Sequence, residues 1–316
     1  MKTIIGNDLN LACTLLKSGE LVAIPTETVY GLAANALDSI AVAKIFEAKN
    51  RPTFNPLIIH LPNLEAVKPY VTEIPELALT LANAFSPGPI SFLLPKSSIV
   101  PDIVTAGTEF VVVRIPNHPL TLELLNNLDF PLAAPSANPF GYVSPVNAKH
   151  VMEGLFGKIP YILDGGACSV GLESTIVGFD QDNIVIHRLG GISVEDIYNC
   201  TGKMPIFSLL HQQPHTPGQL KSHYATRIPL YVGNVEENLE RFKTSTYAVI
   251  SFKQTYKHKG LSYVLSPSGN LAEAATQLFN VMRTIDNTNA EVILAEVFPD
   301  EGLGKAINDR LERAGS

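Results

Sequence analysis

Two cationic side chains, Lys49 and Arg51, stand two residues apart where the sequence predicts the end of a helix. Asp38 is a suitable N-cap for this helix. Pro52 disfavours helical geometry at Arg51, so the chain should leave the helix there. A Lys-x-Arg pair on a stiff exit loop suits an anion better than a packed core, although Lys49 could simply complement the helix C-terminal dipole while Arg51 is solvated. The pair is therefore a candidate anion site that needs support from other residues.

Two loops rich in short polar side chains could complete such a site. Residues 135–139 read Pro-Ser-Ala-Asn-Pro, and their hydroxyl and amide groups can hydrogen-bond a phosphate, a sugar or the backbone. Residues 25–31 read Pro-Thr-Glu-Thr-Val-Tyr-Gly, and their hydroxyls could hold a small polar substrate or only satisfy the amides of a turn. Both stretches are also compatible with ordinary turns. Neither loop identifies a ligand by itself.

Helices are predicted where apolar residues recur at helical spacing after a capping residue. The helix at 38–49 is expected to have an apolar face formed by Ile40, Ala43 and Phe46 with the nearby Val42 and Ile45. Ser144, which proline follows, is expected to start another helix with serine as the N-cap. Strands are predicted between such helices, which is the pattern of an α/β protein.

Strand and helix signals alternate through the first 202 residues, lapse around several prolines, and then resume. Arg114 and Arg188 lie at or beside the ends of two predicted strands, where α/β proteins build sites. We therefore predict three parts, which are a mixed α/β domain at 1–202, a linker at 203–228, and a small α/β domain at 229–316.

The composition is that of a protein with a substantial core. The chain has 316 residues, of which 46% are hydrophobic and 17% are charged. Its formal net charge is −7, and the negative excess lies in the first 200 residues, which argues against broad nucleic-acid binding. Its three cysteines are far apart, and the sequence shows neither a membrane-length apolar run nor a signal peptide. We expect a cytoplasmic protein with a local anion pocket.

The usual phosphate-binding motif is excluded by two substitutions. Gly304 and Lys305 invite a P-loop interpretation, but Pro299 occupies the position of its first glycine and Ala306 replaces its metal-binding hydroxyl. No predicted strand leads into a GxGxxG turn either. If this protein uses ATP, it must bind it in another way.

Several motifs, taken together and in their order along the chain, resemble those of a known protein family, although none of them is specific by itself. In order they are Pro-Thr-Glu-Thr-Val-Tyr-Gly-Leu at 25–32, Lys-x-Arg-Pro at 49–52, Asn-Pro-Leu at 55–57, His60, Ser-Pro-Gly-Pro at 86–89, Val-Arg-Ile-Pro at 113–116, Pro-Ser-Ala-Asn at 135–138, Gly-Leu-Glu-Ser-Thr-Ile-Val at 171–177 and Arg-Leu-Gly at 188–190. This order resembles the YrdC family. The linker and second domain of its long two-domain form are matched by Pro-Gly at 217–218, His-Tyr-Ala at 223–225 and Gly-Leu-Gly-x-Ala-Ile-Asn-Asp-Arg at 302–310.

The resemblance implies a fold and an activity. The implied fold is a YrdC-like twisted mixed sheet with flanking helices, which forms the catalytic domain, followed by a smaller Rossmann-like α/β domain. The linker at 203–228 is implied to be ordered and to contact the active site. The implied enzyme is a threonylcarbamoyl-AMP synthase, which joins L-threonine, bicarbonate or CO2, and ATP and releases pyrophosphate. This is the first step of threonylcarbamoyladenosine formation in tRNA, and the product would pass to a tRNA threonylcarbamoyl-transfer complex.

The resemblance also implies roles for individual residues. A catalytic polar tetrad around the triphosphate is implied for Lys49, Arg51, Ser136 and Asn138. ATP contacts are implied for Arg51, Asn55, Ser136, Ser144, Arg188, His223 and Tyr224. Threonine contacts are implied for Thr28, His60, Arg114, Ala134 and Ser174.

Magnesium is expected as Mg²⁺ carried by ATP, held largely by phosphate and water. The sequence offers no convincing acidic motif for a protein metal site, and Glu27 or Glu173 would be guesses. The chain departs from the family pattern at Asn50, where glycine is frequent between the two cations. Asparagine tolerates left-handed backbone geometry, so the departure leaves the interpretation intact.

Two other functions use the same fold and stay open. One is carbamoyl transfer from carbamoyl phosphate, as in the YrdC-like part of hydrogenase-maturation proteins, which the lack of accessory zinc-finger cysteine pairs disfavours. The other is an RNA-binding module, which the acidic first part of the chain disfavours. Direct tRNA binding is expected to be weak for the same reason.

Overall fold

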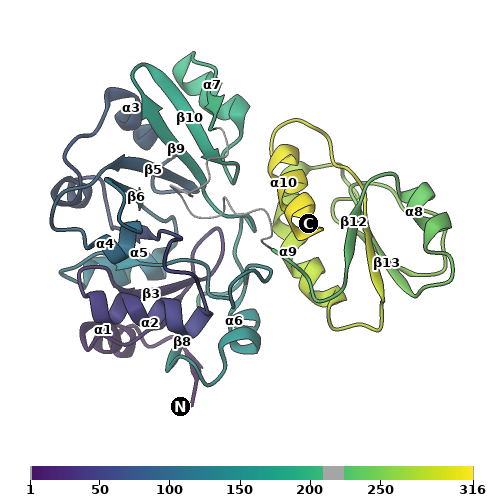
Figure 1. Cartoon of the computed structure of the whole chain (residues 1–316), viewed down its shortest axis with the longest axis horizontal. Helices are drawn as coiled ribbons and strands as arrows, with labels where there is room; N and C mark the ends of the chain where they lie inside the picture. Colours follow the sequence, from purple (N-terminus) through teal and green to yellow (C-terminus); the bar gives the residue numbers. More distant parts are fainter. Residues whose placement is uncertain (1, 209–223, 316) are drawn as a thin grey trace.

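Two β-sheets of unequal size organise the protein. The computed structural model describes residues 2–208 and 224–315, and Figure 1 shows the larger sheet and its helices beside the smaller unit. In the described residues the larger sheet has eleven strands and the smaller has four. No helix in these two ranges combines the length and the apolar character needed to cross a membrane.

The larger sheet is mixed and contains all the strands from the first part of the chain. Its spatial order is β1-β8-β2-β3-β7-β4-β6-β5-β9-β10-β11. The strands are β1 (Ile4–Gly6), β2 (Val22–Ile24), β3 (Gly31–Asn35), β4 (Ile58–His60), β5 (Ile90–Pro95), β6 (Phe110–Arg114), β7 (Leu132–Ala133), β8 (Tyr161–Leu163), β9 (Thr175–Asp180), β10 (Asn183–Arg188) and β11 (Ile206–Phe207).

Helices cover this sheet and fill the connections between its strands. They are α1 (Leu9–Lys17), α2 (Ser39–Lys49), the 3-10 helix η1 (Glu65–Tyr70), α3 (Glu76–Phe85), α4 (Asp102–Thr105), α5 (Pro119–Asn126), α6 (Ala148–Leu155) and α7 (Val194–Thr201). The helix α2 begins after Asp38, whose side chain accepts hydrogen bonds from two amides of the first turn, as the sequence predicted.

The register at the centre of the sheet brings distant residues together. β4 and β6 are parallel neighbours, and His60 lies opposite Arg114. On the other side of β4, the antiparallel β7 places Leu132 opposite His60. The carboxyl ends of β4 and β6 therefore meet at one edge, where α/β folds build binding sites.

The smaller sheet is parallel throughout and has the order β12-β15-β13-β14. Its strands are β12 (Leu230–Val232), β13 (Tyr247–Ser251), β14 (Leu261–Val264) and β15 (Val292–Ala295), and its helices are α8 (Val235–Arg241), α9 (Leu271–Ile285) and α10 (Gly304–Ala314). Helices α9 and α10 lie on the side that faces the larger sheet, and α8 lies away from it (Figure 1). The small unit therefore presents two helices to the region where the large sheet ends.

Two local expectations are wrong. The helix predicted to start at Ser144 begins at Ala148 with Asn147 as its N-cap, because the Ser144 hydroxyl donates to Glu173 instead of capping a helix. On α2, the expected apolar face is wrong at Ile40, which is 75% exposed, and at Ala43, which is exposed, whereas its other members are buried as expected. The residues that α2 buries include Ala41, Val42, Ile45 and Phe46.

Candidate active site

A pocket with an empty volume of ≈ 480 Å³ opens at the carboxyl edge of β4 and β6. Seven residues that the sequence analysis proposed line it, namely Arg51, His60, Arg114, Ala134, Ser136, Arg188 and Tyr224. Val29, Ile58, Pro135 and Glu173 complete the lining. Segments that lie between residues 29 and 188 of the sequence, together with Tyr224, thus converge on one space.

The end of α2 aims Arg51 into this pocket. Asn50 adopts a left-handed conformation (φ 52°, ψ 42°), so the chain turns sharply after the last helical residue. The Arg51 side chain then donates from Nε to the carbonyl of Asn55 at 3.2 Å and from Nη2 to that of Pro56 at 2.9 Å. Burial and the positive charge of Arg188 lower the pKa of Arg51 to about 9. An incoming anion would relieve this repulsion.

Lys49 lies directly behind the loop that presents Ser136. Its ammonium donates to the carbonyl of Ser136 at 2.6 Å and to that of Asn138. The Asn138 amide in turn donates to the carbonyls of Pro139 and Tyr142, each at 2.8 Å. Burial, followed by repulsion from Arg51, lowers the pKa of Lys49. The four residues of the proposed tetrad are therefore neighbours, with Lys49 and Asn138 shaping the loop from outside the pocket lining.

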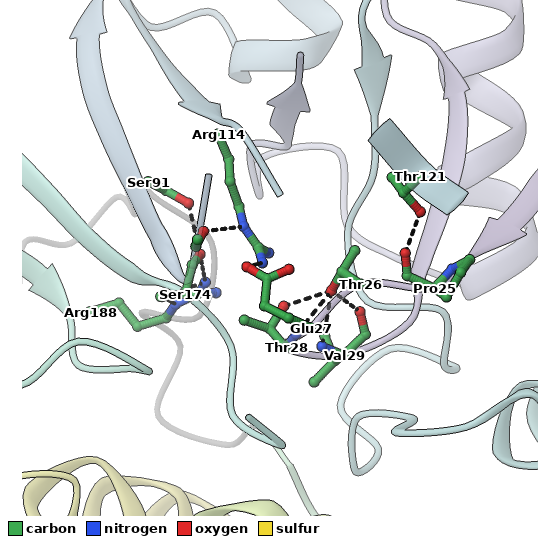
Figure 2. Close-up of polar contacts among 11 residues, drawn as sticks. Pro25, Thr26, Glu27, Thr28, Val29, Ser91, Arg114, Thr121, Ser174 and Arg188 are labelled. Atoms are coloured by element: carbon green, nitrogen blue, oxygen red, sulfur yellow. Dashed lines mark hydrogen bonds and ion pairs between the residues drawn. The ribbon is translucent and has the colours of Figure 1, made fainter. Parts of the chain in front are cut away.

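Arg114 forms a buried ion pair with Glu27 from the 25–31 loop. Its Nη2 lies 2.7 Å from Glu27 Oε1, and both side chains are only 5% exposed. Figure 2 shows the two groups facing each other above the turn that Thr26 closes. In the described structure the second oxygen of Glu27, Oε2, is buried and has no hydrogen-bond partner. A buried carboxylate oxygen without a partner is costly, so this atom is suited to accept a donor from a ligand.

Thr28 is buried within the same turn. The hydroxyl of Thr26 lies 2.8 Å from that of Thr28 and donates to the carbonyl of Val29 at 2.6 Å. The amides of Thr28 and Val29 also donate to the Thr26 hydroxyl, each at 3.2 Å. The loop is therefore a turn closed by its own hydrogen bonds, and its Glu27 carboxylate faces Arg114 (Figure 2).

Arg188 lines the opposite side of the pocket and is held there by Ser174. The guanidinium donates from Nε and Nη2 to the carbonyl of Ser174, at 3.1 and 2.9 Å, and from Nη2 to its hydroxyl at 3.1 Å. The hydroxyl of Ser91 lies 2.7 Å from that of Ser174 (Figure 2). Burial lowers the pKa of Arg188. This arrangement holds a second guanidinium rigidly at the pocket.

His60 is a neutral group in this site. Burial and the nearby charge of Arg114 lower its pKa to about 3. Its Nδ1 has no hydrogen-bond partner among the described residues. It can therefore serve as a neutral hydrogen-bonding group for a substrate at physiological pH.

The remaining proposed residues lie around the pocket. Asn55 is completely buried, and within the described part of the chain neither polar atom of its side chain is bonded. The Ser144 hydroxyl donates to Glu173 Oε1 at 2.6 Å. Tyr224 is buried and lines the pocket, with burial raising its pKa to about 12. His223 lies outside the described residues.

The sequence analysis gave no structural role to three charged residues that form buried ion pairs at the site. Glu27 and Glu173 were considered only as metal ligands, yet each forms an ion pair with a buried arginine. Arg310 belongs to the 302–310 motif that the sequence analysis noted without a role. Its presence in that motif was the only sequence signal that Arg310 has a role. Its pairing with Glu173 could not be predicted, because the two residues are far apart in the sequence.

A protein-held metal site is not evident in the described residues. No group of three or more histidine, cysteine, aspartate or glutamate side chains gathers there. The two carboxylates nearest the pocket, Glu27 and Glu173, are both engaged by arginine. A divalent ion would therefore have to be held mainly by the ligand's own oxygens and by water.

Comparison with known proteins decides the family. A model described as Telomere recombination, which covers the Sua5, YciO and YrdC proteins, matches residues 14–190. A second model, described as the C-terminal domain of threonylcarbamoyl-AMP synthase, matches residues 192–316. The chain belongs to the Sua5/YciO/YrdC family. The family resemblance read from the sequence motifs is thereby confirmed.

Members of the Sua5/YciO/YrdC family resemble this chain over nearly its full length. Threonylcarbamoyl-AMP synthase of Pyrococcus abyssi is 40% identical, with 97% of this chain and 93% of the relative covered. The enzyme of the same name from Bacillus subtilis is 38% identical, with 96% and 91% covered.

Solved structures agree with this assignment. Pyrococcus abyssi Sua5 complexed with L-threonine superposes with a TM-score of 0.91 at 37% identity, covering 99% of this chain and 97% of that chain. The predicted two-sheet α/β fold is confirmed by this match. Full-length HypF in its phosphate- and nucleotide-bound form matches with a TM-score of 0.52 at 24% identity, which shows a likeness of fold alone.

Proposed function

We propose that this protein is a threonylcarbamoyl-AMP synthase, which makes L-threonylcarbamoyladenylate and pyrophosphate from L-threonine, bicarbonate or CO2, and ATP. The observation that carries the proposal is the convergence of Arg51, Arg114 and Arg188 on one pocket of a chain whose net charge is −7. Three guanidinium groups in a confined space suit a ligand with several negative charges. Two full-length relatives with this enzyme name support the substrate assignment.

The chemistry joins three substrates in two steps. The amine of threonine attacks CO2 and loses one proton as the N–C bond forms, which produces a carbamate. A carbamate oxygen then attacks the α-phosphorus of ATP. The bond between the α-phosphorus and the oxygen that bridges it to the β-phosphorus breaks, and pyrophosphate leaves with that oxygen. Negative charge develops on the phosphoryl oxygens in the second step, so fixed cations and donors should supply most of the protein's contribution.

The pocket geometry supports a division of labour among its residues. Arg51 and Arg188 would bind phosphate oxygens, with Ser136, Asn55, Ser144, His223 and Tyr224 as the other proposed ATP contacts. Lys49 and Asn138 would hold the Ser136 loop in its shape, and the charge of Lys49 would also favour the triphosphate. This proposal uses Tyr224 as a pocket residue contributed by the predicted 203–228 linker.

The threonine site is proposed on the Arg114 side of the pocket. Arg114 would bind the substrate carboxylate while staying paired with Glu27, because a guanidinium has donors on two edges. Neutral His60 and the nearby Thr28, Ala134 and Ser174 would recognise the rest of the amino acid. The unpartnered Oε2 of Glu27 is available to accept a hydrogen bond from the threonine amine.

Magnesium is proposed to enter with ATP. Among the described residues no carboxylate cluster offers to bind it directly, so we assign it the role of neutralising the phosphates and helping pyrophosphate depart. Transfer of the product to a tRNA-modifying complex and a cytoplasmic location also remain proposals.

Purified protein supplied with ATP, Mg²⁺, bicarbonate and labelled threonine should form pyrophosphate and a labelled adenylate in equal amounts. Omitting bicarbonate in CO2-free buffer is the matched control and should abolish both products. Arg51→Ala should reduce turnover by about 100-fold or more, because a charge-assisted phosphate contact is lost where charge develops, and Lys49→Ala should also impair it. Folded wild-type protein that yields neither product would refute the proposal.

The two alternative functions have less support. Carbamoyl transfer rests on the HypF likeness, which covers 59% of this chain and 30% of HypF and concerns the fold alone. Labelled carbamoyl phosphate should therefore transfer no label to any product. Tight, salt-dependent RNA binding without adenylate formation would favour the RNA-binding alternative instead.

A further inference from the structure

Arg310 is a fully buried arginine that α10 extends from the smaller unit into the larger one. Its Nε lies 3.0 Å from Glu173 Oε2, and its Nη2 donates to the carbonyl of Leu189 at 2.7 Å. The side chain has 0% exposure. A guanidinium buried this deeply needs several partners, and its Nη1 also pairs with Asp309 of the same helix. Of the two partners in the larger unit, Glu173 lines the active-site pocket and Leu189 directly follows the lining residue Arg188.

The first partner, Glu173, places a negative charge in a pocket proposed to bind a triphosphate. Its other oxygen accepts the hydrogen bond from Ser144, so both carboxylate oxygens are used. Burial would raise the pKa of Glu173, but Arg310 and Arg188 together with the Ser144 hydrogen bond lower it to about 2. Glu173 is therefore ionised, and its charge would repel phosphate unless a cation neutralises it.

The second partner, Leu189, connects Arg310 to the pocket residue Arg188. Leu189 follows Arg188 in sequence, so the bond to its carbonyl fixes the backbone from which Arg188 reaches into the pocket. The adjoining Gly190 packs so closely on the Glu173 backbone that an added Cβ would lie 2.3 Å from the Glu173 carbonyl oxygen. Arg310 thus fastens two pocket segments that already touch.

The smaller unit also holds Tyr224. The guanidinium of Arg310 lies over the Tyr224 ring at 5.0 Å, and Phe279 of α9 stacks on that ring at 5.6 Å with an interplanar angle of 23°. Tyr224 itself has a left-handed backbone (φ 69°), which a tyrosine adopts only when its surroundings enforce it. These two contacts enforce its place in the lining.

We propose that Arg310 is a positioning residue for the nucleotide, which neutralises Glu173 and holds Leu189 and Tyr224, so that the ATP pocket is complete only when the smaller unit is docked. The inference rests on the proposed function, since it takes the ligand to be ATP. It assigns the C-terminal unit a direct part in ATP affinity, through one side chain that does not itself line the pocket.

A purely structural role for Arg310 is the competing explanation, and the same helix offers a matched control. Lys305 forms a second ion pair between the units, at 2.6 Å from Glu195. Neither Lys305 nor Glu195 lines the pocket. Lys305→Met therefore removes a cation of α10 and a bond across the same boundary without touching the active site.

ATP binding measured by calorimetry tests the proposal without relying on turnover, and the chain has no tryptophan whose fluorescence could be used instead. Five full-length proteins are titrated with ATP and Mg²⁺, and separately with threonine. They are the wild type, Arg310→Met, the milder Arg310→Lys, the double variant Glu173→Gln/Arg310→Met, and the control Lys305→Met. Thermal unfolding shows which variants are folded.

Arg310→Met should weaken ATP binding by about tenfold or more, since a buried carboxylate loses its neutralising partner. Lys305→Met should bind ATP like the wild type, and Arg310→Lys should be intermediate. Adding Glu173→Gln to Arg310→Met should restore part of the affinity by removing the unpaired charge, an outcome that a merely structural role does not produce. Threonine affinity should change less than ATP affinity.

The outcomes separate this inference from the proposed function. If the wild type does not bind ATP, the proposed function fails. If the wild type binds ATP and folded Arg310→Met or Arg310→Lys binds it equally well, the positioning role of Arg310 is overturned while the proposed function stands. Equal losses of ATP affinity in Arg310→Met and Lys305→Met would also overturn it, because docking alone would then explain both.

Discussion

Glu27 and Arg114 place two opposite charges where water hardly reaches, with 5% exposure each. Such a pair adds little stability over an apolar pair, but removing one partner strands the other charge in the interior. The sequence motifs assigned Arg114 to threonine and gave its carboxylate partner no structural role. At the scale of single residues, this pair links the substrate site to the stability of the fold.

Glu27→Gln or Arg114→Met alone should each lower the free energy of unfolding by about 3 kcal/mol, because each leaves one buried charge unpaired. The double variant should recover most of that loss, since neither charge remains. Urea unfolding of the four proteins forms a double-mutant cycle. Losses that simply add in the double variant would show that the pair is not coupled.

His60 should make stability depend on pH in a defined window. Its pKa is about 3 in the folded protein and about 6.5 in the unfolded chain. As pH falls from about 6.5 towards 3, the unfolded state binds a proton that the folded state does not, so the free energy of unfolding decreases. Above this window both states are neutral and His60 contributes no slope.

His60→Asn should therefore make the decline of stability with acid shallower by up to about 1.4 kcal/mol per pH unit below pH 6. The measurement is urea unfolding at several pH values from 4 to 9. The range from pH 7.5 to 9 is the internal control, where the two proteins should show parallel curves. Parallel curves at pH 4–6 as well would contradict a neutral, buried His60.

The end of helix α2 is the element that aims Arg51. Asn50 occupies the left-handed C-cap position, and its amide and that of Arg51 bond back to the last turn. Position 50 therefore needs a residue that tolerates positive φ, which asparagine and glycine do and β-branched residues do not. The departure from the family's glycine is compatible with the same turn.

Asn50→Gly should change the free energy of unfolding by less than about 0.5 kcal/mol, while Asn50→Val should lower it by about 1–2 kcal/mol. Only the valine variant should also raise the KM for ATP, because it displaces Arg51. Glu47→Val, at an exposed position of the same helix, is the control for adding valine to α2. If Asn50→Val has the wild-type KM for ATP, the conformation at position 50 does not control the placement of Arg51, and the prediction is wrong.

At the scale of the whole molecule, the two sheets meet through backbone as well as side chains. Gly171 has φ +77°, and a Cβ there would lie 2.5 Å from Thr276 Cα on α9. Arg283 of α9 donates to the carbonyls of Val143, Ser144 and His150, the first at 2.5 Å. The helices of the small unit thus press directly on the segments that carry Ser144 and Glu173.

Gly171→Ala should loosen this contact, because its Cβ collides with rigid backbone in addition to straining φ. Gly107→Ala is the matched control, since Gly107 has φ +78° and nothing within 4 Å of an added Cβ. Gly171→Ala should lose about 1–3 kcal/mol more stability than the control, and it should weaken ATP binding. Equal losses in the two variants would mean that the close approach to α9 is unimportant.

Local sequence patterns were sufficient to predict many of the helices and strands and to identify most residues of the pocket. Asp38 and Pro52 bound α2 as expected, because caps and prolines act on their immediate neighbours. The fold class and the family followed from motif order, and the structural match supports both. Ser144 shows the limit of local reasoning, since it has the sequence context of a helix cap, yet its hydroxyl bonds Glu173 29 residues away.

The packing of the folded chain was needed to show which residues contact one another. It turned Lys49 onto the carbonyls of Ser136 and Asn138, and it paired Glu27 with Arg114 across 87 positions of sequence. It also brought Arg310 to Glu173 across 137 positions, in contact with the pocket wall. A buried charge takes the partner that the packing of strands and helices places beside it, and a one-dimensional pattern of residue types does not encode that distance.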